Sequence, residues 1–366
     1  MSAVPNTNTC PIVVMHGDQT GEELLQESLR VLAPEVIELN LDFQHFDLSL
    51  KNRRATNNEV IKEASAAMKQ SGLGIKAATI TPTEPDGVGS PNALLREQID
   101  GTVILRTGRR IHGVRPVGGV HDPISIVRMA VDDAYGAKEW REGTAAGDEL
   151  AYRTSKISRK VCRNVAEFSF QLAGRTGARV FGGPKFTVSP VYEGMFKEEM
   201  DAAAARHPNV SYDPQLIDTT LALLMKSDGD ALVIPTLNRD GDLLSDLVLQ
   251  MFGSIAGSES LVLAFDDAMQ VKVVMAEAPH GTAPALEGKN IADPMAMILA
   301  GAAILSYIQT PNAERASRAI YESVFEAVHA GQTTTDLGGR LSTTEFTDNV
   351  IARVKAKLEV WRGLRS

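Results

Sequence analysis

Two aspartates at the start of one predicted helix have the types and spacing to do chemistry. Asp242 and Asp246 lie in the segment Asn238-Arg-Asp-Gly-Asp-Leu-Leu-Ser-Asp246, after an apolar run at 231–235 that is typical of a buried strand. A spacing of four puts both carboxylates on one helix face, about one turn apart. Two such anions repel unless a cation lies between them, and a hard divalent cation prefers oxygen ligands. The alternative is a solvated helix start with acids near the positive end of the helix dipole.

Three arginines at the ends of predicted elements are the second signal. Arg96 closes the segment Ser90-Pro-Asn-Ala-Leu-Leu-Arg96, and Arg106 and Arg128 each follow a strand-like apolar run. Guanidinium groups bind carboxylates through paired hydrogen bonds. Because the chain is acidic overall, with a net charge of −9, arginines gathered in one place indicate a pocket for a polyanion. Taken singly, each arginine is better explained as a surface residue.

Two further side chains can move protons. Tyr135 follows Arg128 along the chain, and Lys185 lies in the segment Gly182-Gly-Pro-Lys-Phe-Thr187. A lysine close to a metal ion and to arginines has a lowered pKa and can accept a proton. A surface lysine in a loop is the simpler explanation of Lys185 taken alone.

A turn after a predicted strand at 271–276 suits a nucleotide. In Glu277-Ala-Pro-His-Gly-Thr-Ala-Pro284 the His-Gly-Thr turn exposes N–H groups and a ring, which can bind phosphate and adenine. A turn around a satisfied histidine has the same pattern. Gly72-Leu-Gly-Ile-Lys-Ala77 matches the relaxed dinucleotide fingerprint. That fingerprint needs a strand before it and a helix after it, and the order predicted here is the reverse, which argues against a phosphate loop.

The elements that must position these residues alternate along the chain. An apolar run at 12–15 precedes a helical pattern at 24–32, and a helix face at 60–68 ends at Gly72 before a strand at 74–80. Helical patterns recur at 149–173, near 295–308 and over 314–361, where two helices flank the turn Asp336-Leu-Gly-Gly339. The weakly patterned stretch at 135–148 is expected to leave the main body. Such alternation predicts an α/β sheet that is at least partly parallel.

Length, charge and cysteines exclude several classes of protein. A chain of 366 residues is long enough for two domains. The net charge of −9 argues against nucleic acid or an anionic membrane as partner. Cys10 and Cys162 form neither a disulfide framework nor a zinc motif, and the N-terminal residues have no signal-peptide pattern, so we expect a cytoplasmic protein. The apolar run near 295–308 is short for a membrane span and is expected to be a core helix.

In their order and spacing these motifs resemble the β-decarboxylating dehydrogenase family of isocitrate, 3-isopropylmalate, homoisocitrate and tartrate dehydrogenases. The resemblance covers nearly the whole chain, from the Gly17-Asp18 turn through Thr79-Ile-Thr-Pro82 to Thr335-Asp-Leu-Gly-Gly339. It implies a two-domain α/β fold of the isocitrate/isopropylmalate dehydrogenase type. Residues 1–101 and 259–366 would form the large α/β domain, and 102–258 the smaller dimerising domain, with a clasp-like excursion near 133–157.

The resemblance also implies a role for each candidate residue. Tyr135 would protonate the enol carbon, and Lys185, from the neighbouring subunit, would help to move the hydroxyl proton. The substrate-binding residues would be Thr81, Ser90, Asn92, Arg96, Arg106, Arg128 and Thr187. The metal ligands would be Asp242 and Asp246, with Asp218 reaching across from the partner. The cofactor-binding residues would be Glu277, His280, Gly281, Thr282, Ala283 and Asp293.

The activity implied is metal-dependent oxidative decarboxylation of a 2-hydroxy-3-carboxy acid by a homodimer with shared active sites. A divalent ion, Mg²⁺ or Mn²⁺, would acidify the hydroxyl, a hydride would pass from C2 to the nicotinamide, and the β-carboxylate would leave as CO2. Ser90 together with Asn92 resembles the isocitrate enzymes. Isocitrate, or a close analogue with a polar or anionic substituent such as a phosphonate, is therefore the expected substrate.

The chain also departs from the family pattern. Met129-Ala130 replaces the usual Glu-Asn after the arginine, and Phe186-Thr187 replaces a turn with Asn, both expected beside the substrate and nicotinamide. Where NADP-using members carry Lys-Tyr and many NAD-using members Asp-Ile, this chain carries Ala285-Leu286. The turn at 336–339 is more similar to NAD-using relatives, whereas Lys226 from a partner could face a 2′-phosphate. We therefore expect NAD, with NADP as the alternative.

Three other functions are weighed against this one. Some family members are catalytically silent regulatory subunits, which the changes at Met129 and Phe186 favour and the presence of Tyr135 and Lys185 disfavours. A dehydrogenase of the 3-isopropylmalate, homoisocitrate or tartrate type is the second alternative. A metal-dependent phosphoryl-transfer enzyme is the third, and the lack of a Walker-type loop argues against it.

Overall fold

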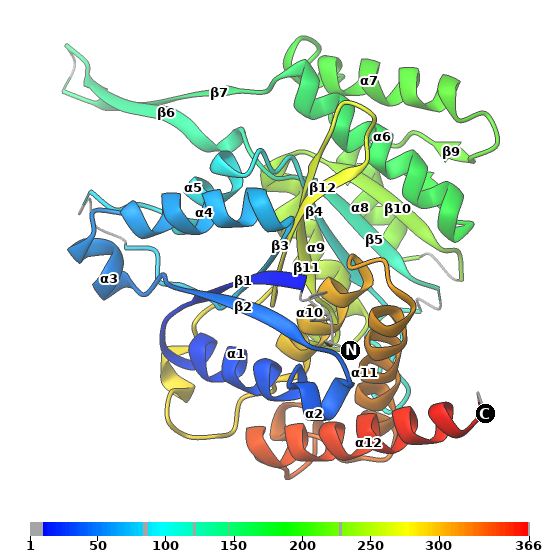
Figure 1. The fold of residues 1–366 in the computed structure, drawn as a ribbon. Helices are drawn as coiled ribbons and strands as arrows, with labels where there is room; N and C mark the ends of the chain where they lie inside the picture. Colours follow the sequence, from blue (N-terminus) through cyan, green and yellow to red (C-terminus); the bar gives the residue numbers. More distant parts are fainter. Residues whose placement is uncertain (1–9, 83–86, 120–121, 146, 227–228, 365–366) are drawn as a thin grey trace, which may run out of the picture.

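One mixed sheet runs through the whole molecule. The computed structural model describes residues 10–82, 87–119, 122–145, 147–226 and 229–364. The strands in these residues are β1 (Cys10–His16), β2 (Leu41–Asp47), β3 (Leu73–Lys76), β4 (Val103–Gly108), β5 (Ile124–Met129), β6 (Asp133–Gly143), β7 (Glu149–Lys156), β8 (Arg179–Phe181), β9 (Tyr212–Asp213), β10 (Leu232–Thr236), β11 (Ser260–Phe265) and β12 (Val271–Glu277). In this part of the chain a 10-stranded sheet has the order β2-β1-β3-β12-β11-β4-β5-β10-β8-β9 (Figure 1). β6 and β7 form a separate hairpin that projects from the body (Figure 1).

The directions of the strands are mixed. β1 runs parallel to β2 and β3, β12 runs parallel to β3, and β10 runs parallel to β5 and β8. β11 is antiparallel to β12 and β4, and β4 is antiparallel to β5. The predicted α/β fold with a partly parallel sheet is confirmed. Strands from 102–258 form one half of the sheet and strands from the two chain ends form the other, and the division into two domains along this line stays a proposal.

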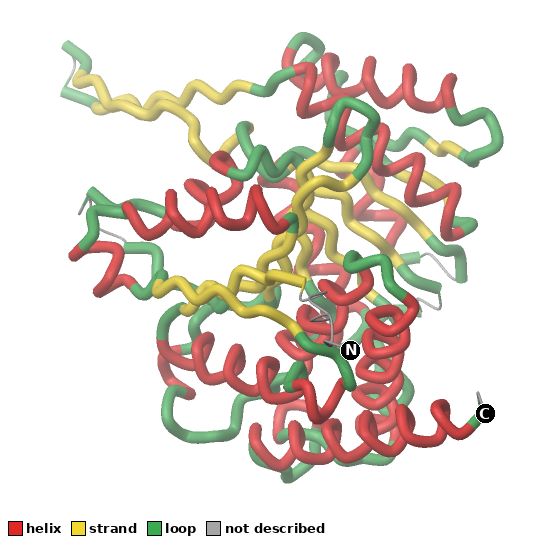
Figure 2. Tube along the Cα trace, in the orientation of Figure 1, coloured by secondary structure: helices red, strands yellow, loops and turns green. Residues whose placement is uncertain are grey.

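Helices cover both faces of the sheet (Figure 2). They are α1 (Gln19–Val31), α2 (Pro34–Ile37), α3 (Leu50–Ala55), α4 (Glu59–Ser71), α5 (Pro91–Gln98), α6 (Arg159–Thr176), α7 (Tyr192–Arg206), α8 (Ile217–Leu224), α9 (Asn238–Met251), α10 (Met295–Ser306), α11 (Pro311–His329) and α12 (Thr343–Gly363), with the 3-10 turns η1 (Ile255–Gly257), η2 (Pro284–Leu286) and η3 (Thr335–Leu337). α4 and α10 pack against β3 and β12, and α6 and α9 pack against β5 and β10. Side chains of β1 alternate between these layers, with Val14 in the cluster that contains α10 and Val13 in the cluster that contains α4.

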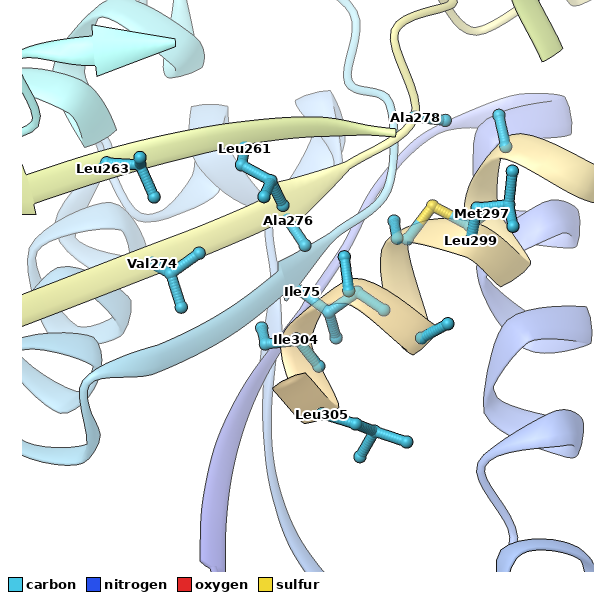
Figure 3. Packing of buried hydrophobic residues seen from close by; sticks show 14 of the residues in the cluster. Ile75, Leu261, Leu263, Val274, Ala276, Ala278, Met297, Leu299, Ile304 and Leu305 are labelled. Carbon is cyan, nitrogen blue, oxygen red and sulfur yellow. The ribbon is translucent and has the colours of Figure 1, made fainter. Parts of the chain in front are cut away.

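The helix predicted as a core element is α10, and it is buried on every side. Each residue from Met295 to Leu305 is buried, as expected for a helix that is apolar all round. Figure 3 shows Ile304 of α10 close to Ile75 of β3, within a buried cluster that also includes Val274 of β12. In the described ranges, none of the helices combines the length and the apolar character that crossing a membrane requires.

Two sequence-based boundaries were wrong and one strand was missed. The helix expected from residue 149 begins at Arg159, after the Ser158 cap, because residues 149–156 pair with β6, where Trp140 stacks on Tyr152. β2 was missed, because only half of its side chains turn inward and the strand has no continuous apolar run. The strand expected at 74–80 ends at Lys76. The predicted order of helix, Gly72 turn and strand is confirmed, with Gly72 in the left-handed conformation after α4.

The Gly17-Asp18 turn explains why β3 ends early. The backbone N–H of Asp18 donates to Ala78 O at 3.0 Å, and its carboxylate accepts from the N–H groups of Leu50 and Ile80 at 2.9 and 2.8 Å. A Cβ on Gly17 would lie 2.1 Å from Ala78 O, so only glycine fits. Residues 78–80 are therefore bound to this turn and not to a neighbouring strand.

Candidate active site

Sheet register brings polar residues of four neighbouring strands into one row. Lys76 of β3 is opposite Glu277 of β12, Glu277 is opposite Ser260 of β11, and Ser260 is opposite Arg106 of β4. The Lys76 ammonium lies 3.1 Å from the Glu277 carboxylate, and the Lys76 side chain is 1 % exposed. Nε of Arg106 donates to Ser260 Oγ at 3.2 Å. A buried charge is costly unless it is paired. The Lys76–Glu277 ion pair and the Arg106–Ser260 hydrogen bond therefore stabilise the charged groups of this row.

Arg106 and Arg128 lie on the sheet face that α9 covers. Arg128 is opposite Ile104 in the register, two residues from Arg106, so both side chains leave the same face. Arg106 donates to Asp246 at 3.1 Å, and Arg128 donates to Asp242 and, at 3.0 and 2.8 Å, to the side-chain oxygen of Asn238. The two acids share one face of α9, as the sequence predicted, and the structure presents this face to the two arginines.

Arg96 completes a group of three guanidinium groups. The side chain of Arg96 is 12% exposed, its buried Nε has no hydrogen-bond partner within the described residues, and its nearest carboxylate oxygen, on Glu277, is 3.9 Å away. Burial lowers the pKa of Arg96, and the positive charge of Arg106 lowers it further. Burial lowers the pKa of Arg128 to about 10, and the charges of Arg96 and Arg106 contribute. Three buried cations that disturb one another are incompletely neutralised, which favours a bound polyanion.

Tyr135 extends from β6 into the same cluster. Its hydroxyl donates to Asp242 at 2.7 Å, and the Arg128 guanidinium lies 5.4 Å from the centre of its ring. Burial raises the pKa of Tyr135, and the hydrogen bond to Asp242 and the charge of Asp242 raise it further. The phenol therefore keeps its proton at neutral pH and has the protonation state that a proton donor needs.

The donor set on α9 fits a hard divalent cation. Burial raises the pKa of Asp246, and the charge of Asp242 adds to the effect, which is the mutual repulsion expected of two close carboxylates. In the described parts of the chain no three acidic, His or Cys side chains form a metal-binding group. Mg²⁺ commonly takes one or two protein carboxylates and completes its shell with substrate oxygens and water. Asp242 and Asp246 suffice for such a site.

The structure keeps Lys185 and Asp218 away from this cluster. Lys185 follows β8, Asp218 is in the first turn of α8, and their side chains form an ion pair with each other. The Lys185 bond lowers the pKa of Asp218. Thr187 is exposed in the same loop as Lys185. Within one chain these three residues form a second, separate group.

The remaining substrate candidates lie around the start of α5. Ser90 is the N-cap of α5 and accepts from Ala93 N at 3.4 Å. The side-chain oxygen of Asn92 is buried and has no hydrogen-bond partner within the described residues, and Thr81 is exposed. Asn92 shares a helix with Arg96 and has an unused acceptor, whereas the Ser90 hydroxyl is already engaged as a cap.

Met129 and Ala130, which replace the Glu-Asn usual in the family, lie in different surroundings. Met129 is fully buried in the core layer under α6. Contrary to the expectation from the sequence, it therefore cannot contact a ligand. Ala130 borders a cavity of about 400 Å³ that Arg96, Tyr135 and Lys160 also line. The small side chain of Ala130 leaves room beside the arginines, and Met129 is a core residue.

Three of the six predicted cofactor residues line a second cavity of about 350 Å³. His280, Ala283 and Asp293 line it, together with apolar residues of α1 and η1. Thr20 of α1 donates to Ala283 O at 2.8 Å and anchors the turn, where Ala283 has a left-handed backbone with φ 43°. Gly281 is exposed and Thr282 partly buried in this turn. Glu277, at the end of β12, joins the turn to Arg96.

Two orphaned polar atoms make this cavity suitable for a nucleotide. Burial lowers the pKa of His280, so the ring is neutral. Its Nδ1 lies 3.0 Å from Gly281 O and must be the donor there, which leaves Nε2 as an acceptor without a partner among the described residues. One carboxylate oxygen of Asp293 is buried and equally without a partner in the described chain. Base and ribose groups can satisfy both atoms.

Sequence reasoning missed four residues of these sites. The missed residues are Thr20, Lys76, Asn238 and Ser260. Lys76 was detectable, because a single lysine inside an apolar strand has to find a buried partner. The role of Ser260 depends on residues far away in the sequence and had no local signal.

Comparison with known proteins identifies the family. The model of the family "Isocitrate/isopropylmalate dehydrogenase" matches residues 11–350. The chain belongs to this family. Its members are NAD(P)-dependent decarboxylating dehydrogenases, and the predicted enzyme class is confirmed.

Similar relatives fall in two branches of the isocitrate/isopropylmalate dehydrogenase family. The isocitrate dehydrogenase [NADP] of Sphingobium yanoikuyae is 29% identical and is covered over 98% of its length, with 96% of this chain. The 3-isopropylmalate dehydrogenase of Methanothermobacter thermautotrophicus is 27% identical over 92% of this chain and 95% of its own length. The structure of isocitrate dehydrogenase from Methylococcus capsulatus has the same fold, with a TM-score of 0.82, 22% identity and coverage of 94% of this chain and 99% of that one.

Proposed function

We propose that this chain oxidises and decarboxylates a 2-hydroxy-3-carboxy acid, with NAD as hydride acceptor and Mg²⁺ or Mn²⁺ as metal ion. Isocitrate, or a close analogue with a polar or anionic substituent, is the proposed substrate. The observation that carries this proposal is the convergence of Arg96, Arg106 and Arg128 beside Asp242 and Asp246. A substrate with several carboxylates would occupy the unused donors of the arginines.

The position of each residue in the cluster suggests its role in the proposed reaction. Arg96, which has the fewest partners, would bind one carboxylate, while Arg106 and Arg128 orient the two acids and the rest of the substrate. A metal ion between Asp242 and Asp246 would supply a Lewis acid that lowers the pKa of the substrate hydroxyl, and the dinucleotide would supply the hydride acceptor. Tyr135 would give its phenolic proton to C3 after CO2 has left, and Arg128 over its ring would stabilise the phenolate.

The cavity beside Ala130 supports a polar substituent on the substrate. It is lined by Arg96 and Tyr135 of the cluster and by Lys156 and Lys160 from the other side. Its volume of about 400 Å³ lies within the usual range of small-ligand pockets, roughly 300–1,000 Å³. Glu97, Asp100 and Asp132 also line the cavity, and Lys156 lies 3.7 Å from Asp132, so Arg96 and Lys160 are the cations that would bind a polar or anionic substituent.

The charge of the second cavity supports NAD over NADP. Among its described lining residues there is no Lys or Arg, and two carboxyl groups, those of Asp293 and Asp336, border it. A 2′-phosphate normally requires cationic partners. At this cavity it would meet negative charge, so we propose that the unphosphorylated dinucleotide binds.

We further propose a homodimer whose partner completes each site. Leu243 and Leu247 are exposed on α9, one position beyond Asp242 and Asp246, so an apolar stripe runs beside the two acids. Met225, which caps the C-terminal end of α8, is 72% exposed and Leu243 is 68% exposed. Side chains of this kind normally mark a surface that another molecule covers. A second copy would bring its own Lys185 and Asp218 toward these acids.

A substrate panel tests the proposed reaction. The purified chain is assayed with isocitrate, 3-isopropylmalate, homoisocitrate, tartrate and a phosphonate analogue, with Mg²⁺, and with NAD and NADP in separate arms. We expect NADH formation with isocitrate or the phosphonate and its loss with a chelator. Binding of these acids without any reduction of cofactor would support a regulatory subunit instead, and chelator-resistant turnover would remove the metal ion from the proposal.

Mixing two inactive variants tests the shared site. Chains carrying Lys185→Met and chains carrying Asp246→Asn are co-expressed with different tags, and the mixed dimer is isolated. If each site uses Lys185 of one chain and Asp246 of the other, one site of the mixed dimer is intact. The isolated mixed dimer then has roughly half of the wild-type activity per dimer. No recovery, with the mixed dimer present, would mean that both residues act from the same chain.

A further inference from the structure

The carboxylate of Asp133 joins three segments that carry candidate active-site residues. Asp133 is the first residue of β6, two residues before Tyr135, and it is 9% exposed. One of its oxygens accepts from the hydroxyl of Tyr192, the first residue of α7, at 2.9 Å. The other accepts from the backbone N–H of Arg239, in the first turn of α9, also at 2.9 Å. A single side chain therefore connects the strand of the proposed proton donor, the helix of the two proposed metal-binding acids and the helix that follows the Lys185 loop.

The stability of the fold does not by itself explain this arrangement. Within the described residues Asp133 makes no ion pair, and its donors are a neutral phenol and a backbone N–H. Burial raises the pKa of Tyr192, and the charge of Asp133 raises it further, so the phenol keeps its proton. Asp132 and Asp133 both have left-handed backbones, with φ 62° and 61°, a conformation that non-glycine residues adopt where other contacts hold it. A buried charge and two strained residues are costly, and such costs are typical of positions that fix the geometry of a site.

The turn at 132–133 holds α9 by a second contact. The side-chain amide of Asn238 donates to Asp132 O at 3.0 Å, and its oxygen accepts from Nε of Arg128 at 3.0 Å. α9 begins without a side-chain cap of its own. Asp133 supplies the carboxylate that a helix N-terminus favours. The start of α9, and with it the place of Asp242 beside Arg128, is therefore fixed by this turn.

The first turn of α7, which Tyr192 ties to β6, fixes the backbone of Lys185. The carboxylate of Glu193 accepts from the backbone N–H of Lys185. The loop is closed by further bonds, in which Lys185 O accepts from the N–H groups of Val188 and Ser189 at 3.0 and 3.2 Å. Lys185 is therefore tied to the strand of the proposed proton donor through α7, although the two lie in separate groups of one chain.

We propose that Asp133 is a positioning residue that sets the place of Lys185 relative to the cluster of its own chain, so that each chain aligns the lysine that it contributes to the partner's site. This inference rests on the proposed function, in which Lys185 acts in the site of the partner. Asp133 acts through Tyr192 and Arg239 and touches neither substrate nor cofactor. The bond to Tyr192 controls Lys185 alone, whereas the bond to Arg239 controls α9.

Tyr192→Phe removes the bond between β6 and α7 and leaves the bond from Asp133 to α9. With isocitrate, NAD and Mg²⁺ we expect kcat to fall by about tenfold, because a small misplacement of an acting group costs about that much or more. KM for isocitrate stays close to the wild-type value, since the arginines of the cluster are untouched. The isotope effect on kcat with isocitrate deuterated at C2 increases, because the hydride step becomes slower relative to product release. Tyr212→Phe is the matched control, because the buried Tyr212 hydroxyl has no hydrogen-bond partner among the described residues.

The mixed dimer shows in which site Tyr192 acts. In the dimer of a Lys185→Met chain and an Asp246→Asn chain, the lysine of the one intact site comes from the Asp246→Asn chain. Tyr192→Phe lowers kcat when it is added to that chain and has no effect when it is added to the other. The reverse result, or equal losses from both placements, would show that Tyr192 does not act through the contributed lysine and would overturn the inference.

Hydrogen exchange read by mass spectrometry tests the link without turnover. Tyr192→Phe speeds exchange in 185–193 and leaves the start of α9 unchanged, whereas Asp133→Ala speeds exchange in both. Unchanged exchange of 185–193 in Tyr192→Phe, an unchanged kcat, or a lower kcat with an unchanged isotope effect each overturns the positioning role and leaves the dehydrogenase intact. A wild type that reduces neither NAD nor NADP with any acid of the panel overturns the proposed function instead, whereas the exchange measurement still decides whether Asp133 holds the Lys185 loop.

Discussion

The arginine cluster and the cofactor cavity have opposite excess charges within one molecule. In the cluster, Arg96 and its two neighbours have more positive charge than the protein neutralises, and a polyanion would supply the balance. In the cavity, which Asp293 and Asp336 both line, burial raises the pKa of Asp293 to about 7, so its ionisation is suppressed. The difference indicates how a chain with a net charge of −9 would accommodate two anionic ligands, by cations at one site and by suppressed ionisation at the other.

Substitution of Lys76, which pairs with Glu277 between the two sites, has the largest expected effect on stability. Lys76→Met leaves Glu277 buried with only the distant Arg96 as a partner. Removing one partner of a buried ion pair lowers the free energy of unfolding by roughly 3–5 kcal/mol, measured by urea denaturation at neutral pH. Lys76→Met combined with Glu277→Gln recovers most of the loss. A single variant as stable as the wild type would show that Glu277 does not depend on Lys76.

Arg96→Met distinguishes a ligand-binding cation from a structural one. The buried Arg96 guanidinium has only a long ion pair, and its burial costs free energy in the unliganded protein. We expect the melting temperature to rise. We also expect kcat/KM for the acid to fall by about 30-fold or more, the loss of roughly 2–5 kcal/mol that follows removal of a buried charge partner. A variant that loses stability and retains kcat/KM would make Arg96 a structural residue.

Asp246→Asn tests the metal-binding half of the cluster. The amide keeps the volume of Asp246 and its place beside Arg106, so the circular dichroism spectrum and melting curve are retained. The concentration of Mg²⁺ that gives half-maximal activity rises by about tenfold or more, because a neutral amide binds a hard cation weakly. Asp240→Asn on the same helix is the control, since Asp240 pairs with Arg239 and not with the cluster. Equal effects of the two variants would contradict a specific site.

Asp293→Asn changes stability by an amount that depends on pH, and the sign of the change follows from the raised pKa of Asp293. A carboxyl whose pKa is raised by folding stabilises the protein fully below its unfolded pKa of about 4. That contribution is lost as pH rises through the folded pKa of Asp293, about 7. The variant lacks this loss, so without cofactor its free energy of unfolding, measured by urea denaturation, gains on that of the wild type between about pH 4 and pH 7, by at most about 1.4 kcal/mol per pH unit. A difference that does not vary with pH would mean that Asp293 ionises normally.

Local spacing was enough to predict part of the fold and part of the site. The periodicity of apolar residues predicted α1, α4 and α10 and the α/β class, because each pattern lies within one element. The four-residue spacing of Asp242 and Asp246 predicted a shared face of α9 for the same reason. β2 and β7 were missed or misassigned because the features that make them strands are pairing partners elsewhere in the chain.

Tertiary structure decided which of these residues meet. Whether Arg96, Arg106 and Arg128 form one cluster depends on the register of β4 and β5 and on the place of α5, and none of these can be read from the spacing within one segment. The pair of Asp293 and Asp336 and the burial of Met129 have the same origin. A sequence determines side-chain periodicity and charge, because these are properties of neighbours along the chain. The pKa of a side chain and its partner depend on burial and on charges brought close by folding, so only the assembled sheet and its helices determine them.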